Sequence, residues 1–198
     1  IIRGRGGEDM LSGGAGDDTV IAVNASSGLW GGAGNDLLLS GAGNDLLLGQ
    51  AGNDSLGAGA GDDDLSGGDG ADSLIGGAGD DTLTGGAGID TLAGGTGNDV
   101  HVIDITGDVI LEAADEGRAD RLITRVDYAL AADAWVELLY VRSSQGRMLE
   151  GNGIANRLFG DGGADTLLGG AGNDTIEGRL GADWMEGGDG NDLLVVQQ

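Results

Sequence analysis

Several residue types that proteins commonly use for covalent cross-linking or for catalysis are missing from this chain. Its 198 residues contain no cysteine, no proline and no lysine, a single histidine, His101, and an aromatic fraction of 3%. Without cysteine, neither disulfide bonds nor thiolate metal sites can form. The lack of proline excludes a collagen-type triple helix. Because so few nucleophiles and bases are present, we expect no enzyme active site.

Positive charge is also scarce, whereas glycine and acidic residues are abundant. The chain carries 34 acidic residues against 9 basic ones, a formal charge of −25, and it has 45 glycines. Nucleic acid and anionic lipid would repel such a chain, and no apolar run is long enough to span a membrane. Glycine raises the entropy cost of folding, and the like charges oppose compaction. A polycation or a metal must therefore supply the missing free energy.

The glycine and aspartate residues recur with a period of nine. One register runs without insertion through residues 4–102, eleven units of which 22–30 is degenerate, and a second block of five units occupies 151–195. Residues 103–150 abandon the period. We expect a first repeat block, a β spacer that continues the stack, and a second repeat block. The chain starts at Ile1 without a basic, apolar signal segment, which indicates a fragment or a trimmed module.

Each unit divides into a six-residue turn and a three-residue strand. The large aliphatic residue at the strand centre points inward while its neighbours point outward, because side chains alternate along a β-strand. The turn glycines allow positive φ and bring backbone carbonyls into the turn without a Cβ in the way. The predicted aliphatic ladder consists of Leu11, Val20, Leu29, Leu38, Leu47, Leu56, Leu65, Leu74, Leu83 and Leu92.

The sixth position of each unit is the candidate metal ligand. An aspartate there, together with the turn carbonyls, makes an all-oxygen site of the kind that Ca²⁺ prefers, whereas soft metals are disfavoured. The candidate carboxylates belong to Asp18, Asp36, Asp45, Asp54, Asp63, Asp72, Asp81, Asp90, Asp99, Asp165, Asp174, Asp183 and Asp192. The candidate carbonyls belong to Gly14, Gly16, Gly32, Gly34, Gly68, Gly70, Gly77, Gly79, Gly170 and Gly172. Solvated turns are the alternative, but they do not explain so many registered copies.

The pattern Gly-Gly-x-Gly-x-Asp-x-U-x, with U a large aliphatic residue, resembles the calcium-binding nonapeptide of the RTX family. Units such as Gly76-Gly-Ala-Gly-Asp-Asp81-Thr-Leu-Thr84 carry the resemblance, and sixteen units cover 144 of the 198 residues. Such regions occur in haemolysins, secreted lipases and metalloproteases, adhesins and mannuronan epimerases. The resemblance implies an all-β fold, a right-handed parallel β-roll in which two units make one coil. It also implies a bacterial protein that is secreted by the type I route or held at the cell surface.

Stacking of alternate units implies two calcium columns, one along each edge of the roll. The even column carries Asp18, Asp36, Asp54, Asp72 and Asp90; the odd column carries Asp9, Asp45, Asp63, Asp81 and Asp99. The second block adds the pairs Asp165/Asp183 and Asp174/Asp192. One ion between each stacked pair gives about nine ions as a minimum. Neighbouring divalent ions about 4.8 Å apart repel by roughly 14 kcal/mol at an effective dielectric constant of 20, so further acids are needed. The expected additional acids are Asp17, Asp62, Asp69, Asp80 and Asp189.

One unit in the odd column is defective. Residues 22–30 keep the length of nine and the inward Leu29, but the glycine turn is lost and Ser27 stands at the ligand position. Because each ion needs both flanking turns, we expect the two odd-column sites beside Ser27 to be vacant or poorly occupied. Completion of a weaker site by Asn24 or by water is the alternative.

The segment 103–150 more loosely resembles the spacer found between repeat blocks of the family. Its pattern predicts strands within 109–111, 121–126 and 136–141, with Trp135 and Tyr140 capping the aliphatic ladder, and 130–135 could form a short helical turn. His101 is expected to fill the core rather than to bind metal or act as a base. Glu112 and Asp120 are secondary calcium candidates.

The arginines of the spacer could form a basic patch that binds a ligand. We expect instead that they pair with nearby acids on a solvated face. The arginines concerned are Arg118, Arg121, Arg125, Arg142 and Arg147, and the acids are Asp115, Glu116, Asp120 and Asp127.

Three functions are compatible with these features. The first is a calcium-dependent structural module, disordered in low cytoplasmic calcium, that folds on export into millimolar calcium. The second is a module that binds a polysaccharide or a partner protein. The third is the tail of a secreted hydrolase or epimerase whose catalytic domain lies outside this chain. Outward apolar residues predict a partner protein or a homo-oligomer, unless the spacer folds back over them. These residues are Ile21, Trp30, Leu37, Leu39, Leu46 and Leu48.

Overall fold

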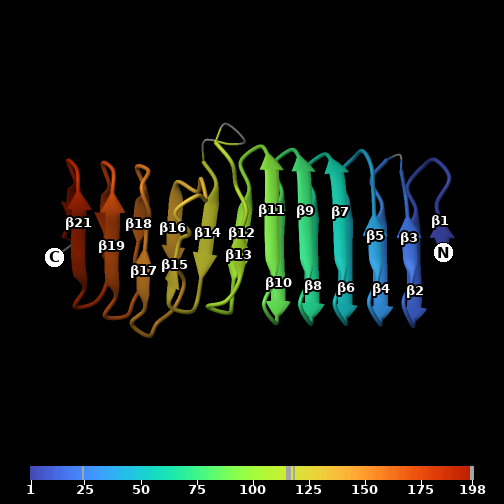
Figure 1. The fold of residues 1–198 in the computed structure, drawn as a ribbon, viewed down its shortest axis with the longest axis horizontal. Coiled ribbons are helices and arrows are strands. Elements are labelled where there is room, and N and C mark those ends of the chain that lie inside the picture. The colour runs from blue at the N-terminus through green and yellow to red at the C-terminus, as the bar shows by residue number, and fades with distance from the viewer. Residues whose placement is uncertain (24, 115–116, 118, 197–198) are drawn as a thin grey trace.

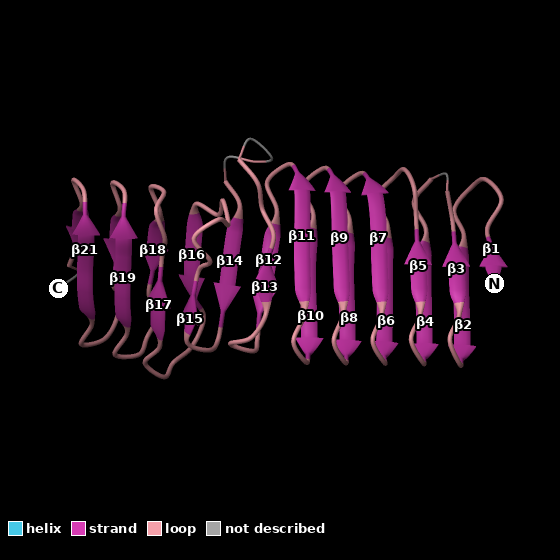
Figure 2. Ribbon diagram, in the orientation of Figure 1, coloured by secondary structure: helices cyan, strands magenta, loops and turns pink. Residues whose placement is uncertain are grey.

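The chain folds into a stack of parallel β-coils. The computed structural model describes residues 1–23, 25–114, 117, 119–196, and expectations that involve Asn24, Asp115, Glu116 or Arg118 fall outside this part of the chain. All secondary-structure elements of the described residues are strands (Figure 2). Because those residues form no helix, none of their elements is a long apolar helix of the kind that crosses a membrane.

The strands belong to three parallel sheets. The first contains β1 (Ile2–Arg3), β3 (Thr19–Ile21), β5 (Leu37–Leu39), β7 (Ser55–Ala60), β9 (Ser73–Ala78), β11 (Thr91–Thr96) and β13 (Val109–Ile110). The second contains β2 (Met10–Ala15), β4 (Gly28–Ala33), β6 (Leu46–Ala51), β8 (Asp64–Asp69), β10 (Thr82–Ala87), β12 (Val100–Ile103), β14 (Arg121–Thr124), β16 (Leu138–Val141), β18 (Arg157–Phe159), β20 (Thr175–Glu177) and β22 (Leu193–Val195). The third contains β15 (Tyr128–Ala129), β17 (Met148–Glu150), β19 (Thr166–Ala171) and β21 (Trp184–Asp189).

The pairing register confirms that two nonapeptide units make one coil. Leu47 of β6 pairs with Leu65 of β8, and Leu56 of β7 pairs with Leu74 of β9, so partners are eighteen residues apart. The coils follow one another along the long axis, and the two chain ends lie at opposite ends of the stack (Figure 1). The all-strand, parallel solenoid expected from the repeats is therefore confirmed.

The interior is the predicted aliphatic ladder. From Val20 to Leu92 each ladder residue is at most 2% exposed, whereas Leu11, near the open end of the stack, is only partly buried. A second buried cluster continues from Ile103 to Ile176. The two clusters meet at His101, which takes the ladder position between Leu83 of β10 and Leu122 of β14. His101 is fully buried, as expected of a core residue.

The spacer continues the stack, but its aromatic residues do not lie where the sequence suggested. Trp135 is 42% exposed, and Tyr140 is on the outer face, where its ring stacks on that of Phe159. The expectation that Trp135 and Tyr140 cap the ladder is therefore wrong. The buried aromatic residue of the spacer is Tyr128, whose hydroxyl donates to the carbonyl of Asp108. Residues 130–135 contain a single turn, closed by the Ala134 N–H on the Ala131 carbonyl, and no helix.

Three arginines lie against aromatic rings on the outer face. Arg142 of the spacer lies over the ring of Tyr140, and Arg157 and Arg179 of the second repeat block lie over the ring of Phe159. No ion pair between a spacer arginine and Asp120 or Asp127 is present in the described part of the chain. The stacked rings offer an uncharged, electron-rich face, which attracts a guanidinium group. Nε of Arg179 also lies 3.9 Å from Oε1 of Glu177.

The six apolar residues expected to form one outer patch do not lie together. Ile21, Leu37 and Leu39 belong to β3 and β5 of the first sheet. Trp30, Leu46 and Leu48 belong to β4 and β6 of the second sheet. Because successive units alternate between the two sheets, residues nine apart point to different outer faces. The single contiguous patch predicted from the sequence is therefore wrong.

Positive φ is concentrated in the turns. All ten glycines proposed as carbonyl donors have positive φ, from 99° to 131°. A Cβ on Gly34 would lie 2.6 Å from the carbonyl oxygen of Gly16 in the preceding coil. Gln50 is an exception, since it has a φ of 83° where other units have glycine. Gly34 therefore needs both the conformation and the absent side chain of glycine, whereas the position of Gln50 needs only the conformation.

Candidate metal centre

A ladder of hydrogen bonds runs along each edge of the roll through the sixth-position aspartates. The backbone N–H of Asp36 donates to Oδ1 of Asp54, and the N–H of Asp54 donates to Oδ1 of Asp72, at 2.7 Å in both cases. The odd column repeats this geometry, with the N–H of Asp63 on Oδ1 of Asp81 at 2.8 Å. Each carboxylate is thus fixed by the coil before it, and one of its oxygens is already committed.

The second oxygen of these carboxylates is buried and has no partner. Within the described residues this is true of Oδ2 of Asp36, Asp45, Asp54, Asp63, Asp72, Asp81, Asp90, Asp99 and Asp174. In most of these units the oxygen points across its own turn, toward the glycine that opens the unit, whereas Ser40 and Ala58 open the units of Asp45 and Asp63. A Cβ on Gly31 would collide with Oδ2 of Asp36 and would lie 2.7 Å from the carbonyl oxygen of Gly49. The glycine therefore leaves space between a bare carboxylate oxygen and a backbone carbonyl.

The structure places all thirteen predicted aspartates in ladders of this kind. Ten are buried, and Asp18, Asp183 and Asp192, which lie nearer the ends of the stack, are partly exposed. Asp174 and Asp192 precede strands of the same sheet as the odd column, whereas Asp165 and Asp183 precede strands of the separate four-stranded sheet. The odd ladder continues from Asp99 to Asp120 and then to Glu137 along the same sheet edge. On that edge Asn156 precedes Asp174 and Asp192.

Sequence reasoning missed some members of the ladders. The even ladder continues from Asp90 to Asp108, whose Oδ1 accepts the N–H of Asp90 at 3.1 Å. The spacing of eighteen from Asp90 was a signal for Asp108 that the break in the glycine pattern obscured. Glu137 gave no such signal, because its spacing from Asp120 is seventeen and that of Asp120 from Asp99 is twenty-one.

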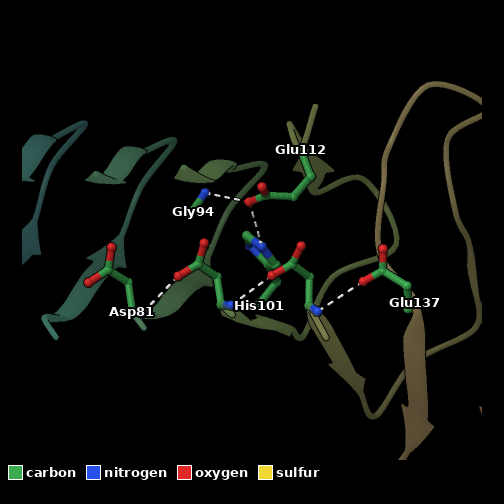
Figure 3. A network of polar contacts seen from close by, with 7 residues as sticks. Asp81, Gly94, His101, Glu112 and Glu137 are labelled. Atoms are coloured by element: carbon green, nitrogen blue, oxygen red, sulfur yellow. Dashed lines mark hydrogen bonds and ion pairs between the residues drawn. The ribbon is translucent and has the colours of Figure 1, made fainter. Parts of the chain in front are cut away.

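The odd ladder meets a second polar group at the start of the spacer (Figure 3). Nε2 of His101 lies 2.9 Å from Oε1 of Glu112, and both side chains are fully buried. The same oxygen accepts the N–H of Gly94 at 2.6 Å. In regular coils the equivalent N–H donates to a strand carbonyl of the next coil, as that of Ser40 does to Gly57. The Glu112 side chain therefore replaces a backbone acceptor where the repeat ends.

Burial disfavours the charged form of these carboxylates. Desolvation raises the pKa of Asp63 and of Asp72 to about 6, and that of Asp81 to about 7. Neighbouring carboxylates raise these pKa values further, while the backbone N–H donor of the preceding coil lowers them. The pKa of Asp120 is also raised to about 7 by desolvation, with Glu112 and Glu137 adding to the shift. A column of such groups needs a cation to remain ionised near neutral pH.

The donor set fits calcium. It combines carboxylates and backbone carbonyls, both hard oxygen ligands, and the unpartnered Oδ2 atoms are available for coordination. Thiolates are absent from the chain, and its one imidazole is beside Glu112 rather than in a turn. These features disfavour zinc and the other metals that prefer nitrogen or sulfur ligands.

Comparison with known families agrees with this geometry. A family model described as the RTX calcium-binding nonapeptide repeat, in four copies, matches residues 1–22, 30–65, 57–92, 66–100 and 150–194. The chain belongs to the RTX repeat family. The unmatched residues 23–29 fall within the defective unit, and the unmatched residues 101–149 comprise the last two residues of the first block and nearly all of the spacer. The RTX pattern is therefore lost where the glycine turns are lost. No curated protein matches the chain.

The defective unit keeps the backbone ladder without the carboxylate. Ser27 is buried, and its N–H donates to Oδ1 of Asp45 at 2.6 Å. The Ser27 hydroxyl accepts the N–H of Asp9 at 3.4 Å and donates to the carbonyl of Ala25. The hydrogen-bond positions of a carboxylate are thus filled by a neutral group, and no negative charge is left over for a cation.

We predict that Ser27→Asp increases the calcium bound per chain by one or two ions, because it restores the charge shared by two odd-column sites. Bound calcium would be measured by atomic emission after dialysis against buffered calcium. Ser144→Asp, which adds the same charge at an exposed spacer position outside the nonapeptide turns, is the control and should add none. Full calcium occupancy beside Ser27 in the unaltered protein would contradict the prediction.

We predict that the calcium-free chain gains β-structure as the pH falls from 8 to 5. The folded chain binds protons more tightly than the unfolded chain, because its buried carboxyl pKa values are raised. This contribution to stability is therefore present at low pH and is lost as the pH rises through about 6 to 7. Circular dichroism in chelator measures the transition.

Asp81→Asn should move this transition to higher pH, because a neutral amide needs no proton at that buried site. Asp80→Asn, an exposed neighbour, changes the net charge equally and serves as the control. Equal shifts in the two variants would show that overall charge, rather than the buried ladder, determines the response.

Proposed function

We propose that this chain is a calcium-dependent structural module of a larger secreted or cell-surface bacterial protein, disordered in the cytoplasm and folded after export. The observation that carries the proposal is the row of buried Oδ2 atoms along the edges of the roll, which have no hydrogen-bond partner among the described residues. The proposed calcium ligands are the sixth-position aspartates, together with carbonyls of the glycine turns. RTX membership supports the calcium specificity and the extracellular location.

The switch follows from the energetics of those carboxylates. Without a cation, folding must bury many like charges or protonate them, and both cost free energy at neutral pH. Calcium binding offsets this cost, so that the free energy of binding becomes free energy of folding. Extracellular modules typically bind calcium in the range of about 10⁻⁴–10⁻³ M, whereas cytoplasmic sensors respond below that range. A chain of this charge and glycine content therefore stays unfolded until it leaves the cell.

We assign no catalytic role to this module. The buried polar side chains of the described residues are largely committed to the carboxylate ladders or to the contact between His101 and Glu112. If the parent protein is a hydrolase or an epimerase, its reacting groups lie on another part of that protein, and this module supports them.

We predict that calcium converts the chain from a disordered state to a β-structured state at pH 8, with a midpoint near millimolar calcium and a steep response because neighbouring ions share aspartates. Magnesium should not replace calcium, because it demands a smaller octahedral site and retains its water ligands. Far-ultraviolet circular dichroism during titration tests both statements. A fully folded chain in chelator at pH 8 would overturn the proposed function.

Recognition of an acidic polysaccharide is a second candidate, and one surface favours it. The rings of Tyr140 and Phe159 stack with their centroids 4.7 Å apart on the outer face of the eleven-stranded sheet. Arg142, Arg157 and Arg179 lie 5.1 to 6.0 Å from these rings. Three of nine basic residues thus gather on one face of a very acidic chain. Guanidinium groups beside aromatic faces suit a carboxylated sugar chain.

We predict that the double variant Arg157→Gln and Arg179→Gln weakens binding of the calcium-loaded module to hyaluronate several-fold, because it removes two of these cations. Binding would be measured by calorimetry with and without calcium. Arg3→Gln with Arg5→Gln, which removes the same charge from an exposed terminal segment, is the control. Absence of binding by the unaltered module, or equal losses in both double variants, would exclude this second candidate while leaving the calcium switch intact.

A further inference from the structure

The end of the even ladder contains a third carboxylate that the repeat does not provide. Asp104 follows β12, and Asp108 precedes β13, so both belong to the connection that leads into the spacer. One ligand atom from each of Asp90, Asp104 and Asp108 lies within 4.8 Å of the others. Asp104 and Asp108 are outside every segment that matches the RTX repeat.

Two oxygens of this group are buried and lack partners. Asp90 is completely buried, and its Oδ2 has no hydrogen-bond partner among the described residues. Oδ1 of Asp104 is likewise inaccessible and without a partner there. The oxygens of Asp108 accept the N–H groups of Asp90 and Ile105, at 3.1 and 3.4 Å. These hydrogen bonds link Asp108 to Asp90 and to Ile105, and they leave one oxygen of Asp90 and one of Asp104 bare.

The local charge balance is that of a divalent cation site. Desolvation raises the pKa of Asp104, and the nearby guanidinium of Arg125 lowers it. Three carboxylates and one arginine sum to a charge of −2, which a single divalent cation would cancel. An oxygen-only donor set of this charge favours Ca²⁺ over metals that prefer nitrogen or sulfur.

We propose that Asp90, Asp104 and Asp108 form a calcium site at the junction between the first repeat block and the spacer, in which Asp104 is a ligand that no nonapeptide turn provides. This inference rests on the proposed calcium-dependent function and adds a site to it. The junction is where the glycine turns stop and where the two buried apolar clusters are separated by His101. An ion held by Asp90 on one side and by Asp104 and Asp108 on the other links the first block to the spacer.

The test compares the complete chain with Asp104→Ala and Asp104→Asn in saturating calcium. Both variants should bind one calcium ion fewer than the unaltered chain, and both should need several-fold more calcium for folding of residues beyond the junction. Asp133→Ala, which removes an exposed acid of the same spacer, is the matched control and should leave the calcium count unchanged. Unchanged counts in both Asp104 variants would overturn the proposal.

Anomalous scattering from crystals of the unaltered chain grown in calcium gives a second readout that does not depend on how the variants fold. A calcium peak between the three carboxylates is expected. A map with peaks in the nonapeptide turns but Arg125 paired directly with Asp104 would overturn this site alone. An unaltered chain that binds no calcium anywhere would instead overturn the proposed function.

Discussion

Each regular coil of this roll buries two carboxylates, and no arginine in the described part of the chain forms an ion pair with them. The backbone N–H of the preceding coil satisfies one oxygen and positions the other, so repulsion between successive aspartates cannot be relieved by moving a side chain. Desolvation increases that cost. The backbone hydrogen bonds and the apolar contacts of the fold are therefore satisfied, but the negative charge of the buried carboxylates is not neutralised. Its stability depends on a cation or on protons.

The apolar core has a supporting role. Each coil contributes one aliphatic residue from each of its two strands, and these residues form a thin double row with no large aromatic side chains in the repeat block. Such a row buries little area per residue compared with an ordinary domain. The aliphatic row determines which face of each strand points inward, while the carboxylates along the edges determine whether the stack forms at all. The same division explains why Ser27 disturbs the edge without disturbing Leu29 beside it.

Most of the repeat region could be predicted from the sequence because a strict period leaves one consistent register. Once Asp45 and Asp63 occupy equivalent positions, the places of Leu47 and Leu65 follow, and the structure confirms them. The boundaries of the three segments and the identity of the metal ligands remain predictions. The error about the outer apolar patch came from treating adjacent units as neighbours in space. Stacked neighbours are two units apart, so Leu39 and Leu48 face different sides.

The spacer was harder to predict because its ladder residues are irregularly spaced and chemically varied. Because the spacings to Asp120 and then to Glu137 are twenty-one and seventeen, the period does not identify Glu137 as a ladder residue, and the Glu112 side chain takes a role that a backbone carbonyl has elsewhere. A buried contact such as that between His101 and Glu112 leaves no periodic trace in the sequence. The arginines on Tyr140 and Phe159 could not be placed either, since ring stacking between strands nineteen residues apart depends on the changed coil length.

The alternation of units between two sheets limits how the roll can change in length. Deleting one unit of nine residues would transfer every later strand to the opposite sheet and every later aspartate to the opposite edge, so both columns would break at that point. Deleting two units would remove one whole coil and leave the remaining coils in register. The roll can thus be lengthened or shortened cleanly only in steps of eighteen residues. The unit in which this fold can gain or lose length is therefore the coil and not the sequence repeat.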